Sequence, residues 1–158
     1  MKKLFAAWCI VIAATLRGYS QSSVQLLLAQ SDLETGTWDN DGKWWTDKNL
    51  FGMSEMQNAD RRKRLVGVRM GPDGLKRAQF ASLWSSVQDR LDWDTQMQIS
   101  QKDYLYSVSS KFHPSPDYPG SVLNRIKGTQ QMYFSALALT PIIILIIWKI
   151  IKLILAVR

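Results

Sequence analysis

The longest apolar run of the chain lies near its C-terminal end. From Phe134 to Trp148 no residue is charged, and only Lys149 and Lys152 interrupt the apolar residues that follow, up to Arg158. As a helix, residues 134–157 would span about 36 Å, enough for a hydrocarbon core of about 30 Å if the lysine side chains reach the interface. The pattern predicts a transmembrane segment at 133–158, with an interfacial helix or a buried C-terminal helix as the alternatives.

A second apolar run begins at the N-terminus. Lys2 and Lys3 precede an uncharged stretch from Leu4 to Thr15, which is the pattern of a secretory signal segment. The same residues also fit a helix over 4–17 that Gly18 ends, followed by serines that can cap the next helix. The pattern alone leaves both interpretations open.

The next helix is predicted in the stretch SSVQLLLAQSDLETG, which ends at Thr35 and Gly36. Gln30 and Glu34 are four residues apart and share a face at its C-terminal end. There the helix dipole disfavours an ionised carboxylate, so Glu34 favours the protonated state that a general acid needs. A solvated surface glutamate is the alternative.

Composition limits the chemistry that the chain can carry. At 158 residues it has room for one ordinary domain and a short appendage. With one cysteine and one histidine, it has no intramolecular disulfide and no Cys/His zinc site, so we predict no metal site and no cofactor. The net charge of +7 suits an anionic partner, which nucleic acid, a membrane surface or a cell wall would each satisfy.

Four blocks of sequence, in order, resemble the glucosaminidase family, whose bacterial and phage members cut peptidoglycan glycans. The blocks are LLLAQSDLETGTW, NLFGM, FASLWSSVQDR and FHPSPDYPGSV. They are distributed over residues 24–127, which is most of the chain before the C-terminal apolar run, and the pairing of the first block with NLFGM 15 residues after Glu34 is the most specific part.

The resemblance implies a mainly α (α+β) fold: a lysozyme-like helical domain over residues 1–130 with a small β-hairpin lobe. The hairpin is expected from residues 64–70 and 75–80, around the turn 71–74. Further helices are expected at about 83–97, 101–111 and 119–127. Because a helix precedes the glutamate-bearing helix in such proteins, we favour residues 4–17 as the first helix of the domain over a signal segment.

The resemblance also implies an activity. The chain is expected to be a membrane-anchored peptidoglycan hydrolase of the β-N-acetylglucosaminidase type, with Glu34 as general acid. Asp60 is the expected second carboxylate, in the β lobe, and Asp73 is a weaker candidate because it occupies a turn. The expected substrate-binding residues are Gln30, Trp38, Asn49, Phe51, Gly52 and Tyr118; Trp44 and Trp45 are further aromatic candidates for a sugar groove.

The expected partners are peptidoglycan glycan strands and, through the C-terminal helix, a lipid bilayer, with no nucleic acid. The chain would then be a single-pass protein of a bacterial envelope or a virion membrane, and a phage virion-associated lysin fits this description. Three alternatives stay open. They are a lytic transglycosylase on the same fold, a non-catalytic wall-binding or structural protein, and a membrane-perturbing protein in which the tail is the active part.

Overall fold

The computed structural model describes residues 1–36, 38, 43–54, 63–71, 74–113 and 115–156. In chain order the elements are α1 (Lys2–Leu16), α2 (Gln21–Glu34), α3 (Lys43–Thr46), β1 (Leu65–Met70), β2 (Lys76–Phe80), α5 (Leu83–Gln96), α6 (Tyr104–Phe112) and α7 (Tyr118–Ala156). This confirms the predicted mainly helical chain with one small hairpin.

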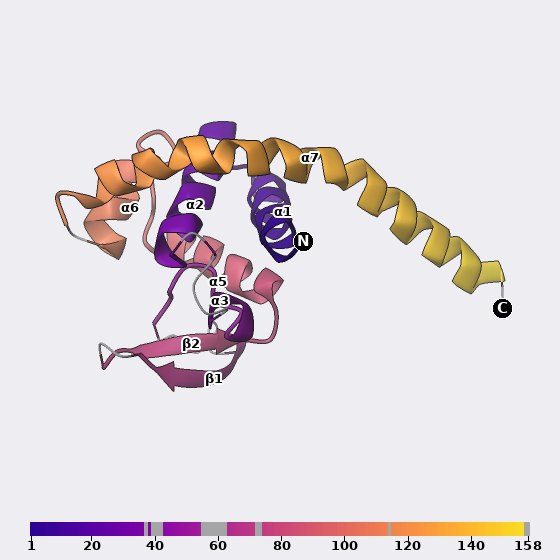
Figure 1. Ribbon diagram of the computed structural model, residues 1–158, viewed down its shortest axis with the longest axis horizontal. Helices are drawn as coiled ribbons and strands as arrows, with labels where there is room; N and C mark the ends of the chain where they lie inside the picture. The colour runs from indigo at the N-terminus through magenta and orange to yellow at the C-terminus, as the bar shows by residue number, and fades with distance from the viewer. Residues whose placement is uncertain (37, 39–42, 55–62, 72–73, 114, 157–158) are drawn as a thin grey trace.

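The long helix α7 organises the packing of the other helices. It lies across α2 and α1 and contacts both, as Figure 1 shows. The β1–β2 hairpin lies on the opposite side of the molecule from α7, and α5 lies between them. The helices therefore form the core, with the small sheet at its edge.

The N-terminal helix α1 is part of that core. Its buried side chains are Ala6, Ala7, Cys9, Ile10, Val11, Ala13 and Ala14. They pack against α2, α5 and α7. The many alanines allow the neighbouring helix backbones to approach closely, so the run that resembles a signal segment is a buried helix in this structure.

Substitution of Ile10 tests this packing. Ile10 is fully buried, whereas Leu16 on the same helix is 76% exposed. We expect Ile10→Ala to lower the free energy of unfolding by about 2–5 kcal/mol, through lost burial and the cavity left behind. Leu16→Ala should change it by less than about 0.5 kcal/mol. Urea unfolding of the full chain in detergent measures both, and equal small losses would show that α1 lies outside the core.

The hairpin is tied to the rest of the chain through the segment before it. Strands β1 and β2 pair antiparallel, with a register shift between Leu65 and Gly67. The Ala78 amide donates to the Met53 carbonyl (2.9 Å), and the Phe80 amide donates to the Asp47 carbonyl (2.9 Å). These bonds make the 47–53 segment a neighbour of β2 and set the lobe beside the end of α2.

Helix α7 differs from the prediction at one point. The sequence predicted a last domain helix at about 119–127, a domain that ends at residue 130 and a separate tail from 133, but one helix runs through all of these residues. Val122, Thr129, Tyr133 and Ala136 are all buried, at spacings that place them on one helix face. Because this face packs on α1 and α2, the packed part of the chain extends to at least Ala136, not to residue 130.

Beyond Ala136 the helix leaves the other elements (Figure 1). Its most apolar window of 18 residues has a mean hydropathy of 2.3 and no buried residue. By length and composition, α7 could cross a membrane. Pro141 lies within it and removes one backbone hydrogen bond, which membrane helices tolerate.

Candidate active site

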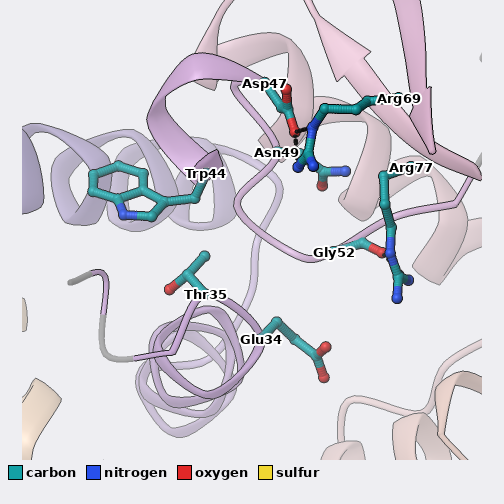
Figure 2. A pocket seen from close by; sticks show the side chains of 8 residues that line it. All are labelled: Glu34, Thr35, Trp44, Asp47, Asn49, Gly52, Arg69 and Arg77. Carbon is teal, nitrogen blue, oxygen red and sulfur yellow. Dashed lines mark hydrogen bonds and ion pairs between the residues drawn. The ribbon is translucent and has the colours of Figure 1, made fainter. Parts of the chain in front are cut away.

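Glu34 is the last residue of α2, and local chemistry fixes where that helix starts and stops. The Ser20 hydroxyl caps the first turn by accepting from the Ser23 amide (3.2 Å). At the other end the Thr35 hydroxyl donates to the Ser31 carbonyl (2.7 Å) and accepts from the Trp38 amide (3.2 Å). These bonds end the helix at Glu34, whose half-buried side chain extends toward the side on which Gly52 and Arg77 lie (Figure 2).

The NLFGM block is held against Glu34 from two directions. The Ser31 hydroxyl of α2 donates to the Leu50 carbonyl (2.7 Å), and the Leu50 amide donates to the Ser86 hydroxyl of α5 (3.0 Å). Gly52 then lies so near that a Cβ atom there would be 3.3 Å from Glu34 Oε2. Its φ of +59° also favours glycine, so this position suits a close approach to the carboxyl group.

Tyr118, in the first turn of α7, hydrogen-bonds to the glutamate. Its hydroxyl donates to Glu34 Oε1 (2.8 Å) and accepts from Gln30 Nε2 (2.9 Å). The His113 ring stacks on the Tyr118 ring with centroids 5.0 Å apart. The phenol is therefore oriented by contacts on two sides.

The surroundings of Glu34 raise its pKa above the ordinary value. Burial is the largest cause, since it disfavours the charged form. The Tyr118 hydrogen bond and the nearby His113, Arg77 and Arg90 act in the opposite direction but are weaker. A carboxyl group that keeps its proton to higher pH is suited to donate it.

Two hollows meet at Glu34. The first, about 180 Å³, is lined by Glu34, Thr35, Trp44, Asp47, Asn49, Gly52, Arg69 and Arg77, and Figure 2 shows Glu34 and Arg77 extending from different walls. The second, about 270 Å³, is lined by Leu33, Glu34, His113, Ser115, Asp117, Tyr118 and Ser121. Because Glu34 lines both, an extended ligand has room on either side of its carboxyl group.

The second carboxylate expected from the sequence cannot be compared with this arrangement. Asp60 and Asp73 both lie outside the described residues. Among the described residues that line the first hollow, Asp47 carries the other carboxylate, which sequence reasoning missed. The sequence did contain a sign of it: Asp47 lies two residues before Asn49, which begins the NLFGM block that the resemblance places at the site.

Asp47 is held by the hairpin. One carboxylate oxygen accepts from Arg69, with an Nε–Oδ2 distance of 2.7 Å, and the other accepts from Gln79 Nε2 (2.9 Å). The Asp47 side chain is 4% exposed, whereas that of Arg69 is 36% exposed, so the carboxylate is buried but its ion pair is only partly buried. The residue therefore anchors β1 and β2 to the segment that carries Asn49 and Gly52.

We expect Asp47→Asn to lower the free energy of unfolding by about 1–3 kcal/mol, because it weakens the hydrogen bonds that Arg69 and Gln79 give to a buried carboxylate. Asp92→Asn is the matched control. Asp92 also pairs with arginines, Arg17 and Arg64, but its side chain is 26% exposed, and such pairs contribute about 1 kcal/mol or less. Urea unfolding compares the two variants, and a larger loss in Asp92→Asn would contradict the anchoring role.

Three of the expected substrate-binding residues are buried. Gln30 is 1% exposed and Phe51 is fully buried. Trp38 is 2% exposed, and its indole donates to the Ser31 hydroxyl (3.1 Å). Their side chains pack inside the protein in this structure, so their contact with substrate stays a prediction from sequence; their spacing placed them near Glu34 without revealing which way their side chains face.

The other expected residues do border the two hollows. Gly52 and Asn49 line the first, and Tyr118 lines the second. The Asn49 side chain is used internally, because its amide donates to the Met53 and Ala78 carbonyls (both 2.9 Å). Of the tryptophans, Trp44 lines the hollow beside Glu34. It also lines a separate hollow near Lys2 and Met132, together with Trp38 and Trp45.

Within the described part of the chain, no three His, Cys, Asp or Glu side chains gather in a way that could hold a metal ion. Comparison of the chain with protein-family models, curated proteins and solved structures finds no match. The four sequence blocks are nevertheless joined to one another by hydrogen bonds. Leu50 of the second block bonds to Ser86 of the third, Arg90 of the third bonds to Gln30 of the first, and Tyr118 of the fourth bonds to Glu34 of the first.

Proposed function

We propose that this chain is a membrane-anchored enzyme that cuts the glycan strand of peptidoglycan, with Glu34 as the general acid. The observation that carries the proposal is the half-buried Glu34 carboxyl group, bonded to Tyr118 and open to a hollow on each side. The likeness to glucosaminidases supports the same assignment. A lysozyme-like arrangement of helices and hairpin is part of the proposal.

The proposed chemistry requires one proton transfer at the start. Glu34 gives its proton to the glycosidic oxygen, the bond from that oxygen to the anomeric carbon breaks, and water then completes hydrolysis. The carboxylate left behind is stabilised by Tyr118, Arg77 and His113, which favour its charged form. Burial therefore favours the protonated form before the transfer, and the Tyr118 hydroxyl and the nearby basic groups stabilise the carboxylate after it.

Asp60 remains our proposal for a second carboxylate in the hydrolytic route. Asp47 is less suited to attack or activate water, because Arg69 and Gln79 occupy its oxygens. This favours one alternative: a lytic transglycosylase, in which a substrate hydroxyl replaces water and a single acid suffices. The transglycosylase reaction closes an anhydro ring on its product and creates no reducing end, so analysis of the products distinguishes it from hydrolysis.

The membrane part of the proposal rests on α7. The helix leaves the packed elements after Ala136 and is long and apolar enough to cross a bilayer. Since the same helix carries Tyr118 at its other end, the anchor and the site belong to one rigid element. Cleavage is then expected close to the membrane that holds the protein.

The test uses the full chain, purified in detergent, on isolated wall sacculi. Loss of turbidity with new reducing ends supports a hydrolase, and loss of turbidity without them supports a transglycosylase. Protein that sediments with intact sacculi would replace the proposal with a wall-binding role. Vesicle leakage without any effect on sacculi would replace it with a membrane-perturbing one.

A further inference from the structure

A chain of buried hydrogen bonds runs behind Glu34. Arg90 Nη2 donates to Gln30 Oε1 (2.9 Å), and Gln30 Nε2 donates to Tyr118 Oη (2.9 Å). Tyr118 Oη in turn donates to Glu34 Oε1 (2.8 Å). The chain links α5, α2 and α7 to the carboxyl group.

The direction of every bond follows from its first member. A guanidinium group can only donate, so the amide oxygen of Gln30 must face Arg90 and the amide nitrogen must face Tyr118. The Tyr118 oxygen then accepts from that nitrogen. Its single hydrogen is left for Glu34.

Arg90 is held in place by its neighbours, so it cannot turn and change the direction of these hydrogen bonds. It is fully buried, pairs with Asp94, and also donates to Tyr104 Oη (3.2 Å). The Tyr104 and Tyr19 hydroxyls both donate to Asp94 Oδ2, at 2.8 and 2.9 Å. Three rings surround the guanidinium, with Phe51, Phe112 and Trp93 centroids 5.7, 5.3 and 4.8 Å from its central carbon.

We propose that Gln30 is a positioning residue: Arg90 orients it so that it offers Tyr118 no competing acceptor, which leaves Glu34 Oε1 as the acceptor of the Tyr118 hydrogen and the transferable proton on Oε2. Oε2 is the oxygen that approaches Gly52, which lines the first hollow together with Glu34. The catalytic meaning of this assignment rests on the proposed function. The direction of the hydrogen bonds does not depend on the proposed function.

Other groups around Glu34 act on its charge but not on this direction. Arg77 reaches it from β2, His113 from the segment after α6, and Arg90 from α5. The two hollows also bring Asp47, Arg69 and Asp117 to its surroundings. The test therefore compares variants that leave all six of these groups in place.

Direct titration of Glu34 is possible because the chain has only two glutamates, Glu34 and Glu55. In protein labelled with ¹³C at the glutamate carboxyl carbon, two signals are expected, and Glu34→Gln identifies the signal of Glu34. The first variant is Tyr118→Phe. If Tyr118 donates to the carboxylate, its loss raises the midpoint of the Glu34 titration by about one pH unit or more. A fall in the midpoint would mean that Tyr118 accepts the proton of Glu34, and would overturn the proposal.

The second variant is Gln30→Glu, which keeps the size of the side chain but offers an acceptor to both Arg90 and Tyr118. It adds a third glutamate signal, recognised because it is absent from the wild type, and the charge that it adds is common to both members of the comparison. The Tyr118 hydrogen should turn toward residue 30, so that Glu34 loses its donor. Adding Tyr118→Phe in this background should then change the Glu34 midpoint by less than a third of its effect in the wild-type background. An equal effect in both backgrounds would show that Gln30 does not set the direction.

Gln30→Met is the matched control. It removes both bonds of Gln30 without adding an acceptor, so Tyr118 should still donate to Glu34 and Tyr118→Phe should keep its full effect. Circular dichroism of each variant checks that it folds. The Tyr118→Phe result decides the direction of the Tyr118–Glu34 bond even where Gln30→Glu does not fold, and a reversed direction overturns the proposal. In active protein the alkaline limb of the pH profile should follow the Glu34 midpoint. If the Glu34 midpoints change as expected but the protein cleaves no wall material, the proposed function is rejected and the proposed direction of the hydrogen bonds stands.

Discussion

Replacing Glu34 by glutamine is expected to abolish glycan cleavage while the protein stays folded. The amide keeps the shape of the side chain but has no proton to give to a leaving oxygen. It can still accept from Tyr118 through its carbonyl oxygen, so the contact with α7 can persist. Loss of a positioned general acid costs on the order of 10²–10⁴-fold in rate.

The measurement is the release of soluble glycan from sacculi by equal amounts of the two proteins. Asp103→Asn is the control, because it also replaces one carboxylate by an amide but at an exposed position outside both hollows. Wild-type cleavage by Glu34→Gln would remove Glu34 from the mechanism. A similar loss in Asp103→Asn would point to a general effect of charge.

The same variant has a consequence for stability that does not depend on catalysis. Burial raises the pKa of Glu34 in the folded state, so the folded chain holds this proton more tightly than the unfolded chain does. The associated stability is complete at pH below the unfolded value and is lost as pH rises through the folded value. Glutamine does not titrate. Glu34→Gln should therefore unfold at a higher temperature than the wild type at pH 7, and at nearly the same temperature at pH 4. A higher unfolding temperature of the wild type at pH 7 would contradict the buried site.

Much of the helical arrangement was predictable because local rules determine it. The apolar spacing in residues 21–34, a serine cap and the stop at Thr35 define α2 without help from the rest of the chain. The Gln30–Glu34 spacing placed both side chains on one helix face. The hairpin followed from two apolar stretches around a Gly-Pro-Asp-Gly turn.

The direction of the site side chains was not predictable, because distant residues decide it. Gln30 is turned inward by Arg90, 60 residues away. Asp47 is held by Arg69 and Gln79, which no local pattern connects with it. Side chains of the right type near Glu34 could therefore be named from sequence, but contact with a ligand could not be separated from support of the glutamate.

The continuity of α7 was missed for a related reason. Gly128, Thr129 and two glutamines interrupt the apolar pattern, which suggested a link. Thr129 is nevertheless buried and donates to the Arg125 carbonyl (3.1 Å), which satisfies its hydroxyl within the helix. A polar residue whose hydrogen bond is local can lie on a packed face, so a polar stretch did not mark the end of the domain.

This continuity changes where the tail must be cut to test the membrane anchor. Tyr133 is 7% exposed and Ala136 is fully buried, and both belong to the core. Removal of residues 133–158 would therefore take core side chains away together with the apolar helix. Removal of residues 141–158 keeps them and deletes only the part of α7 that begins at Pro141.

We expect the full chain to require detergent or a bilayer, and the chain ending at Thr140 to be soluble with its wall cleavage retained. The chain ending at Met132 should be less stable, since it leaves the surfaces of α1 that Tyr133 and Ala136 cover open to water. Flotation with lipid vesicles and urea unfolding of the two truncated chains measure these differences. A full chain that stays in solution without detergent, beside a chain ending at Thr140 that aggregates, would show that the apolar helix covers another protein surface. Residues 141–156 are about 24 Å long as a helix, so crossing about 30 Å of hydrocarbon also requires residues 137–140, which precede Pro141. Leu137, which is 39% exposed, is accordingly expected to contact lipid, and the domain with Glu34 should lie directly on the membrane surface.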